Sequence, residues 1–190
     1  MVKQVTLMLE AVSEILVTED KIQARIKELG QAISKDYAGR EPVLACVLKG
    51  AAVFLADLMR NITVPVSVDF LSIASYGPGQ ESSGIVRMTK DLDMSISGQD
   101  VLLIEDIIDT GRTLSYLLQL LSARQPRSLE VCVLLDKPSR HLVQLPLKYV
   151  GFEIPDKFVV GYGLDYNQRY RNLPFVCTLK PSAYRSASLR

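Results

Sequence analysis

The sequence lacks the residues on which several common kinds of functional site depend. It contains one histidine, His141, and three cysteines among 190 residues. A serine or cysteine triad needs an imidazole partner and a zinc site needs several soft ligands, so we expect neither. Cys46, Cys132 and Cys177 lie in apolar, strand-like runs, which predicts three buried thiols, without a disulfide, and favours a reducing compartment.

The sequence also has almost no net charge and no long apolar run. It has 22 basic and 21 acidic residues, a formal charge of +1, which gives no global case for binding nucleic acid or a membrane. No uncharged stretch approaches the ~20 apolar residues that span a bilayer. The N-terminal segment MVKQVTLMLE has a short apolar run that Glu10 interrupts, with no cleavage site after it. We therefore expect a cytoplasmic protein.

Segments of helical and strand-like character alternate along the chain. Apolar residues spaced by four, three, four and four predict an amphipathic helix that ends near Gly39, at Ile22, Ile26, Leu29, Ile33 and Tyr37. We expect helices also at 51–60 and 114–123, and strands at 43–48, 66–74, 101–104 and 131–135. Such alternation predicts an α/β fold with a mostly parallel, twisted sheet flanked by helices, in one domain.

The most informative stretch is VLLIEDIIDTGRT, at residues 101–113. It places Glu105 and Asp106 at the end of an apolar run, where ligands bind in open parallel sheets. Asp109 then leads into Thr-Gly-Arg-Thr and the start of a helix, whose unpaired N–H groups suit a phosphate. No Walker phosphate-loop spacing occurs in the chain. The alternative is that the acids only solvate a strand end and cap a helix, but three carboxylates within five residues make it less favoured.

This stretch closely resembles the phosphoribosyl pyrophosphate motif of type I phosphoribosyltransferases, and more narrowly that of the hypoxanthine-guanine branch. The similarity runs in order from about Leu48 to Lys180. It implies the type I phosphoribosyltransferase fold, a lid at about 75–84 and a small flap or hood from about 149–180. We expect the tail, 181–190, to be poorly ordered. Composition alone favours an ordinary hairpin loop at 75–84.

The resemblance implies a role for each acid of the central stretch. Glu105 and Asp106 would hold the ribose hydroxyls and bind Mg²⁺ together with Asp165. Asp109 would be the general base. The ribose phosphate would lie against Asp109, Thr110, Gly111, Arg112 and Thr113. Pyrophosphate would contact Lys49, Gly50, Ser75, Tyr76 and Arg171, with a cis peptide bond before Lys49.

The purine site is also implied by the resemblance. Lys137 would donate to the six-position oxygen of the base, which would disfavour adenine because two donors would then oppose each other. Phe158 would stack on the purine, while the Val159 backbone and Asp165 would meet its edge. Taken singly, Lys137 could be a surface lysine, Phe158 a core residue, and Asp165 with Arg169 or Arg171 a surface ion pair.

The implied activity is transfer of 5-phosphoribosyl from phosphoribosyl pyrophosphate to hypoxanthine or guanine by a homo-dimer or homo-tetramer. One rival is a phosphoribosyl pyrophosphate-sensing regulator that binds nucleic acid, which the near-neutral charge disfavours. Another is a receiver-type signalling domain, which would leave the segment from Phe158 to Arg171 unexplained. The sequence gives no firm role to Arg140 and does not decide between hypoxanthine and guanine.

Overall fold

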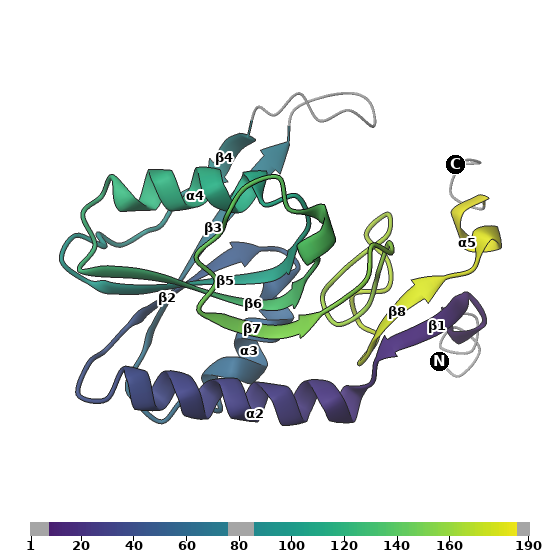
Figure 1. Cartoon of the computed structure of the whole chain (residues 1–190), viewed down its shortest axis with the longest axis horizontal. Coiled ribbons are helices and arrows are strands. Elements are labelled where there is room, and N and C mark those ends of the chain that lie inside the picture. Colours follow the sequence, from purple (N-terminus) through teal and green to yellow (C-terminus); the bar gives the residue numbers. More distant parts are fainter. Residues whose placement is uncertain (1–7, 76–85, 186–190) are drawn as a thin grey trace.

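The chain folds around a six-stranded sheet (Figure 1). The computed structural model describes residues 8–75 and 86–185. The strand order is β4-β3-β2-β5-β6-β7, and neighbouring strands are parallel except for the antiparallel pair β3 and β4. This confirms the mostly parallel sheet. Its strands are β2 (Val43–Leu48), β3 (Ser67–Ser75), β4 (Val86–Lys90), β5 (Asp100–Ile108), β6 (Ser128–Asp136) and β7 (Tyr149–Glu153).

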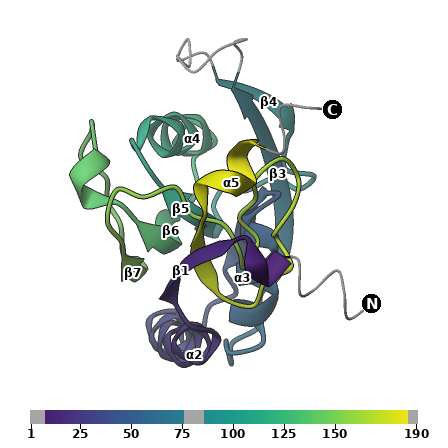
Figure 2. The ribbon, with the colours of Figure 1, turned by 90° about the vertical axis from the view of Figure 1, so that its right-hand side faces the viewer.

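Helices cover both faces of this sheet, as Figures 1 and 2 show: α2 and α3 lie on one face and α4 on the other. Their observed bounds agree with the sequence prediction to within a few residues. None of the helices in the described part of the chain is both long and apolar enough to cross a membrane. The three helices are α2 (Glu19–Asp36), α3 (Ala51–Met59) and α4 (Arg112–Ser122).

The central strands are buried on both faces, and this explains their continuous apolar runs. In β2, Leu44 and Cys46 pack on the α2 and α3 side, whereas Ala45 and Val47 pack on the α4 side. The same alternation holds over residues 101–104 of β5 and 131–134 of β6, because successive strand residues point to opposite faces. The three cysteines are free and buried, as predicted.

A second, two-stranded sheet lies beside the main one (Figure 2). It pairs β1 (Val12–Val17) with β8 (Val176–Leu179) in antiparallel fashion, and α5 (Pro181–Arg185) follows β8. Two expectations were therefore wrong in part. Tyr149–Glu153 do not belong to a separate flap, because they pair with β6 in the main sheet. Pro181–Arg185 are helical, and Tyr184 packs against a small apolar cluster there.

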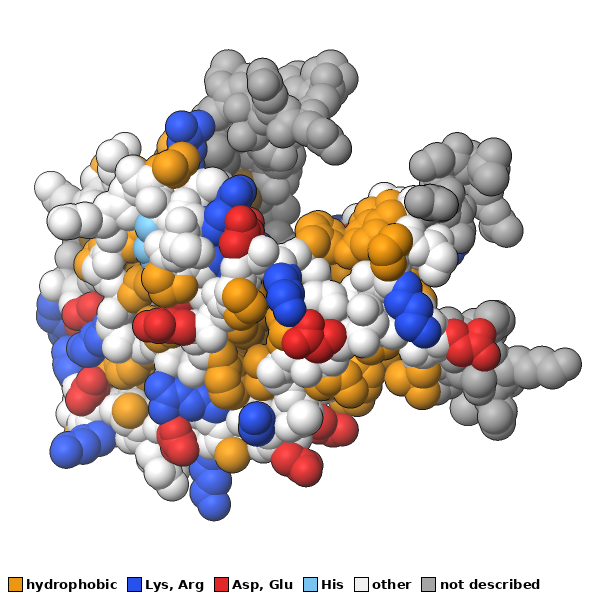
Figure 3. All heavy atoms as spheres, turned by 45° about the vertical axis from the view of Figure 1, so that its right-hand side comes forward, with side chains coloured by type: hydrophobic (Ala, Val, Ile, Leu, Met, Phe, Trp, Pro, Cys, Tyr) orange, Lys and Arg blue, Asp and Glu red, His pale blue; other side chains and the backbone are white. Residues whose placement is uncertain are grey.

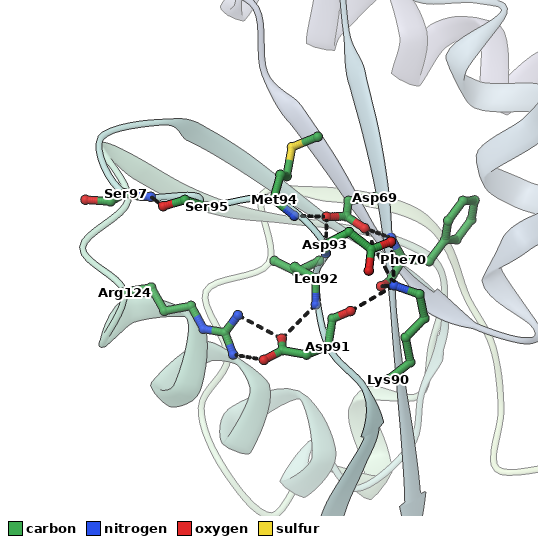
Figure 4. Close-up of polar contacts among 10 residues, drawn as sticks. All are labelled: Asp69, Phe70, Lys90, Asp91, Leu92, Asp93, Met94, Ser95, Ser97 and Arg124. Carbon is green, nitrogen blue, oxygen red and sulfur yellow. Dashed lines mark hydrogen bonds and ion pairs between the residues drawn. The ribbon is translucent and has the colours of Figure 1, made fainter.

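The connection from β4 to β5 is held by charged side chains (Figure 4). Asp69, buried in β3, accepts hydrogen bonds from the backbone N–H groups of Asp93 and Met94 at 2.8 and 3.0 Å. Both guanidinium NH₂ groups of Arg124 donate to Asp91, at 2.8 and 2.9 Å. These contacts fix the end of β4 against β3 and against the residues that follow α4.

Candidate active site

The first two acids of the central stretch lie inside a strand rather than beyond its end, whereas Asp109 follows it. β5 continues to Ile108, four residues further than the apolar run suggested, because Ile107 and Ile108 still pair with β6. Glu105 pairs with Val133 of β6, and Asp106 lies between it and the paired Ile107, so both acids are held within the strand. The turn that follows is short, and α4 begins at Arg112 after Gly111, whose φ of +80° suits glycine.

A cavity of about 160 Å³ lies at this end of β5. Both strand acids, the third carboxylate and the turn border it together, so the central stretch encloses a single space. Arg112 does not line this cavity: its side chain is exposed at the first position of α4. The lining residues are Glu105, Asp106, Ile107, Ile108, Asp109, Thr110, Gly111, Thr113 and Leu114.

The first two acids are kept from ionising easily. Burial, and then the neighbouring Asp106 carboxylate, raises the pKa of Glu105 well above its ordinary value. Burial raises the pKa of Asp106 to about 6, and the Asp165 carboxylate acts in the same direction. The backbone N–H of Ile107 and the charge of Arg171 oppose this shift. Neighbouring carboxylates with raised pKa values that line a cavity are typical of functional sites.

Asp109 is in a different electrostatic environment. Each of its carboxylate oxygens accepts from one cation: Lys137 Nζ lies 3.2 Å from Oδ2, and Arg140 Nε lies 2.8 Å from Oδ1. Partial burial acts to raise the pKa of Asp109, but the hydrogen bonds from Arg140 and Lys137 lower it below its ordinary value. The three acids of one short stretch therefore have pKa values shifted in opposite directions, which is how sites separate acid and base roles.

A second cavity, of about 180 Å³, adjoins the first and shares Asp106, Ile107 and Asp109 with it. It brings together, from segments far apart in the chain, the four residues predicted for the purine and one of those predicted for pyrophosphate, Arg171. Its other lining residues are Lys137, Phe158, Val159, Leu164, Asp165 and Arg171.

Phe158 is 53% exposed, so the alternative interpretation of Phe158 as a core residue is wrong. The edges or faces of two tyrosine rings contact it: Tyr166 and Tyr184 each lie 6.0 Å from it between ring centroids, at steep angles. Tyr184 belongs to α5, so the C-terminal helix supports this ring. Sequence reasoning missed both tyrosines, since nothing in their spacing marks them as partners of Phe158.

Asp165 and Arg171 form the ion pair that the alternative interpretation predicted, with 2.6 Å between Oδ1 and the guanidinium. The pair nevertheless lines the second cavity. Arg171 also donates to the Gly163 carbonyl at 2.6 Å. Its position is thus set by two partners on the same segment.

The loop after β2 reaches the same place. The peptide bond between Leu48 and Lys49 is cis, as the resemblance implied. A Cβ on Gly50 would lie 1.5 Å from Asp106 Oδ2, and one on Gly163 would lie 2.2 Å from the Gly50 carbonyl oxygen. Both glycines are therefore needed for close backbone approach. Lys49 is exposed and lines neither cavity.

The structure does not describe the side chains of two predicted pyrophosphate contacts, Ser75 and Tyr76. Tyr76 lies outside the described residues, as does nearly all of the 75–84 segment. Ser75 ends β3, and only its backbone is described.

The carboxylates fit a hard divalent cation only if water or substrate oxygens complete its coordination shell. Within residues 8–75 and 86–185, no three His, Cys, Asp or Glu side chains come close enough together to hold a metal ion by themselves. Mg²⁺ typically takes one or two protein carboxylates and completes its shell with water and substrate oxygens. Glu105, Asp106 and Asp165 border the shared cavities and offer such oxygens.

A mostly parallel α/β sheet with clustered acids and a helix N-terminus at one strand end is typical of phosphate-binding proteins of the α/β class. The chain belongs to the phosphoribosyl transferase domain family, whose model matches residues 13–167. It is 48% identical to the hypoxanthine-guanine phosphoribosyltransferase of Bacillus subtilis over 92% of this chain and 97% of that one.

Solved structures agree. A hypoxanthine phosphoribosyltransferase from Staphylococcus aureus superimposes with a TM-score of 0.90 at 49% identity, over 94% of this chain and 97% of that one. The chain is also 49% identical, over 91% of its length, to the bifunctional protein TilS/HprT of Listeria monocytogenes. It spans only 27% of that longer relative.

Proposed function

We propose that this chain transfers 5-phosphoribosyl from phosphoribosyl pyrophosphate to hypoxanthine or guanine in purine salvage, giving IMP or GMP and pyrophosphate. The observation that carries the proposal is the pair of adjoining cavities that share Asp106, Ile107 and Asp109. One cavity has the size and donors for a ribose phosphate, and the other has an exposed aromatic ring and a lysine for a base. Relatives named for this activity support it.

On the ribose side, Glu105 and Asp106 hold the sugar hydroxyls. As the bond from the anomeric carbon to pyrophosphate breaks, with its electron pair leaving on oxygen, the sugar becomes cation-like. Carboxylates fixed in a strand stabilise this charge without having to reorganise. The N–H groups that begin α4, with Thr110 and Thr113, hold the 5′-phosphate; Arg112 contributes mainly its backbone.

On the purine side, the base stacks on Phe158, meets the Val159 backbone and Asp165 at its edge, and accepts a hydrogen bond from Lys137. The nine-position nitrogen forms the new bond to the anomeric carbon, and Asp109 accepts the proton that the imidazole ring gives up. The residues proposed to bind the base and to accept its proton therefore line one cavity.

On the pyrophosphate side, Arg171 and the loop of Lys49 and Gly50 hold the leaving group, with Ser75 and Tyr76 as further proposed contacts. Mg²⁺ would be held by one or two of the carboxylates of Glu105, Asp106 and Asp165, with water and substrate oxygens completing its shell, and would neutralise the charge of pyrophosphate. We also propose that the protein is cytoplasmic, which three free cysteines support, and a homo-dimer or homo-tetramer.

A base panel tests the function. Purified protein is supplied with Mg²⁺ and phosphoribosyl pyrophosphate, and pyrophosphate release is measured with hypoxanthine, guanine, xanthine, adenine and uracil. We expect turnover with the first two bases and little with adenine or uracil. The absence of turnover with every base would contradict the proposal and favour a regulatory protein that only binds phosphoribosyl pyrophosphate.

A regulator that binds nucleic acid would need a basic face. On the face visible in Figure 3, acidic and basic side chains are interspersed. The near-neutral net charge agrees with this picture. These features favour the enzyme.

Lys137→Gln should lower kcat/KM for hypoxanthine by ~10–100-fold, because a charged hydrogen bond to the base is worth about 1.5–3 kcal/mol. Discrimination against adenine should shrink as well, since glutamine can accept as well as donate. Lys148→Gln is the matched control, because Lys148 pairs with Asp36 and Glu130 and lines neither cavity. Unchanged base preference in the Lys137 variant would remove this residue from base recognition.

Tyr184→Ala should raise the KM for hypoxanthine by roughly 2–10-fold, because an edge-to-face aromatic pair is worth about 0.5–1.5 kcal/mol. The KM for phosphoribosyl pyrophosphate should change little, since Tyr184 contacts the Phe158 and Tyr166 rings and lines neither cavity. Steady-state kinetics with each substrate varied in turn measures both constants. Tyr184→Phe keeps the ring and should behave like the parent; an equal loss in both variants would contradict the stacking argument.

A further inference from the structure

The general base proposed above, Asp109, is held by two cations. Lys137 reaches one oxygen of Asp109 and Arg140 the other, at 3.2 and 2.8 Å. The two cations differ in their surroundings, because the Lys137 side chain is 6% exposed and that of Arg140 is 45% exposed. Only Lys137 lines the purine cavity. Arg140 approaches Asp109 from outside it.

Both cations belong to a segment that is fixed to the turn after β5. Arg140 ends the short 3₁₀ helix η1 (Pro138–Arg140), directly after Lys137. The Lys137 N–H donates to the Ile108 carbonyl at 3.0 Å, and the Leu142 N–H donates to the Thr110 carbonyl at 3.0 Å. These bonds on either side of η1 hold its backbone over Asp109. The position of Arg140 is thus set by the fold and does not depend on a substrate.

Under the proposed function, the Lys137 ammonium donates hydrogen bonds to two different acceptors. In the structure it pairs with Asp109 Oδ2, and under the proposed function it donates to the six-position oxygen of the bound purine. When its ammonium turns to the base, Oδ2 loses a cation at the moment when it must accept a proton. Since that cation helps to hold the pKa of Asp109 low, its departure makes Asp109 a better base.

Arg140 then becomes the remaining partner of Asp109. Its bond to Oδ1 keeps the carboxylate from swinging away, so that Oδ2 still faces the imidazole ring. Other charged groups near Asp109 are Asp156, which lies 3.6 Å from Arg140 and 3.9 Å from Lys137, and Asp106, Asp165 and Arg171, which line the same cavity. Among these, Arg171 is already paired with Asp165.

We propose that Arg140 is a positioning residue that orients Asp109 for proton transfer, while Lys137 couples recognition of the six-position oxygen to release of the other carboxylate oxygen. This inference rests on the proposed function. In the step itself the purine nitrogen bonds to the anomeric carbon, pyrophosphate leaves with the electron pair, and the imidazole proton passes to Asp109 Oδ2. Lys137 and Arg140 keep their protons throughout.

The test compares Arg140→Gln and Arg140→Lys with the parent. Because Arg140 orients the base without touching a substrate, we expect Arg140→Gln to lower kcat roughly 10–100-fold, as for a misplaced catalytic group. The KM values for hypoxanthine and phosphoribosyl pyrophosphate should stay within about threefold of the parent. Arg140→Lys keeps the charge and should recover most of the lost kcat. Thermal unfolding checks that each variant is folded.

Arg124→Gln is the matched control. It removes an arginine that donates two hydrogen bonds to an aspartate, Asp91, outside both cavities (Figure 4). It should keep the parent kcat. An unchanged kcat in Arg140→Gln, a rise in KM alone, or no rescue by lysine would overturn the role of Arg140. These results require an active parent; a parent inactive with every base would overturn the proposed function, and this role with it.

Discussion

Asp109→Asn is expected to lower kcat by ~10²–10⁴-fold, the usual worth of general base catalysis. Asparagine fills the same space and can still accept from Arg140, but its amide cannot take up a proton at neutral pH. Substrate binding should survive, because Phe158, Lys137 and the helix N-terminus remain in place. The KM values for both substrates should therefore stay within about threefold of the parent. Steady-state kinetics measures both effects.

Asp156→Asn provides a control for this loss of charge. Asp156 pairs with the same two cations as Asp109 but lines neither cavity. It should keep most of the parent activity. If the two variants lost kcat equally, the effect would come from the local charge balance, and the proton-transfer role of Asp109 would be wrong.

Asp106→Asn should stabilise the substrate-free protein and also abolish most of its activity. At neutral pH the parent must keep a carboxylate charged in a buried site, which burial and Asp165 make unfavourable. An amide has no such cost, and each 1 kcal/mol gained raises Tm by roughly 2–4 °C in a domain of this size. Turnover should fall by about 10²–10³-fold, because a carboxylate near the cation-like sugar is lost.

The pH dependence of this stability difference follows from the direction in which the pKa of Asp106 is shifted. The pKa of Asp106 is raised to about 6 in the folded protein, above the ordinary carboxyl value of 3.8. The folded state therefore binds the proton more tightly than the unfolded state, and this contribution to stability is complete below pH ~4 and lost as pH rises through about 6. The Tm advantage of Asp106→Asn should be small at pH 4.5 and should grow towards pH 7.5.

Asp91→Asn should show the opposite effect on stability. The pKa of Asp91 is lowered by its hydrogen bonds from Arg124 (Figure 4), so neutralising it removes a favourable interaction at neutral pH. A small decrease in Tm with unchanged turnover is expected. If Asp106→Asn also lowered Tm at pH 7.5, the argument that its burial is costly would fail.

Much of the fold could be predicted from the sequence because burial leaves a pattern. The 22-26-29-33-37 spacing marked α2, and the apolar run 43–48 marked β2 with its observed bounds. Strands covered on both faces need continuous apolar runs, and amphipathic helices need a period of about 3.6 residues. Segments without such patterns were less predictable: β1 was not foreseen, and the end of β5 was placed four residues early.

The early end of β5 has a specific cause. Glu105 and Asp106 are charged residues in a buried strand, and a prediction based on apolar runs ends the strand at the first charged residue. Both residues remain in the strand, where burial raises their pKa values. Places where pattern and structure disagree in this way are where functional residues are expected.

The sequence by itself determined the alternation of helices and strands, the parallel sheet and the residue types of the central stretch, because each depends on neighbours a few positions away. Only the tertiary structure decided that Arg140 and Lys137 share Asp109, that Tyr184 supports Phe158, and that Gly50 and Gly163 meet beside Asp106. These contacts join residues from 26 to 113 positions apart. No local periodicity encodes such pairs, because they form only when the whole sheet brings its strand ends and loops together.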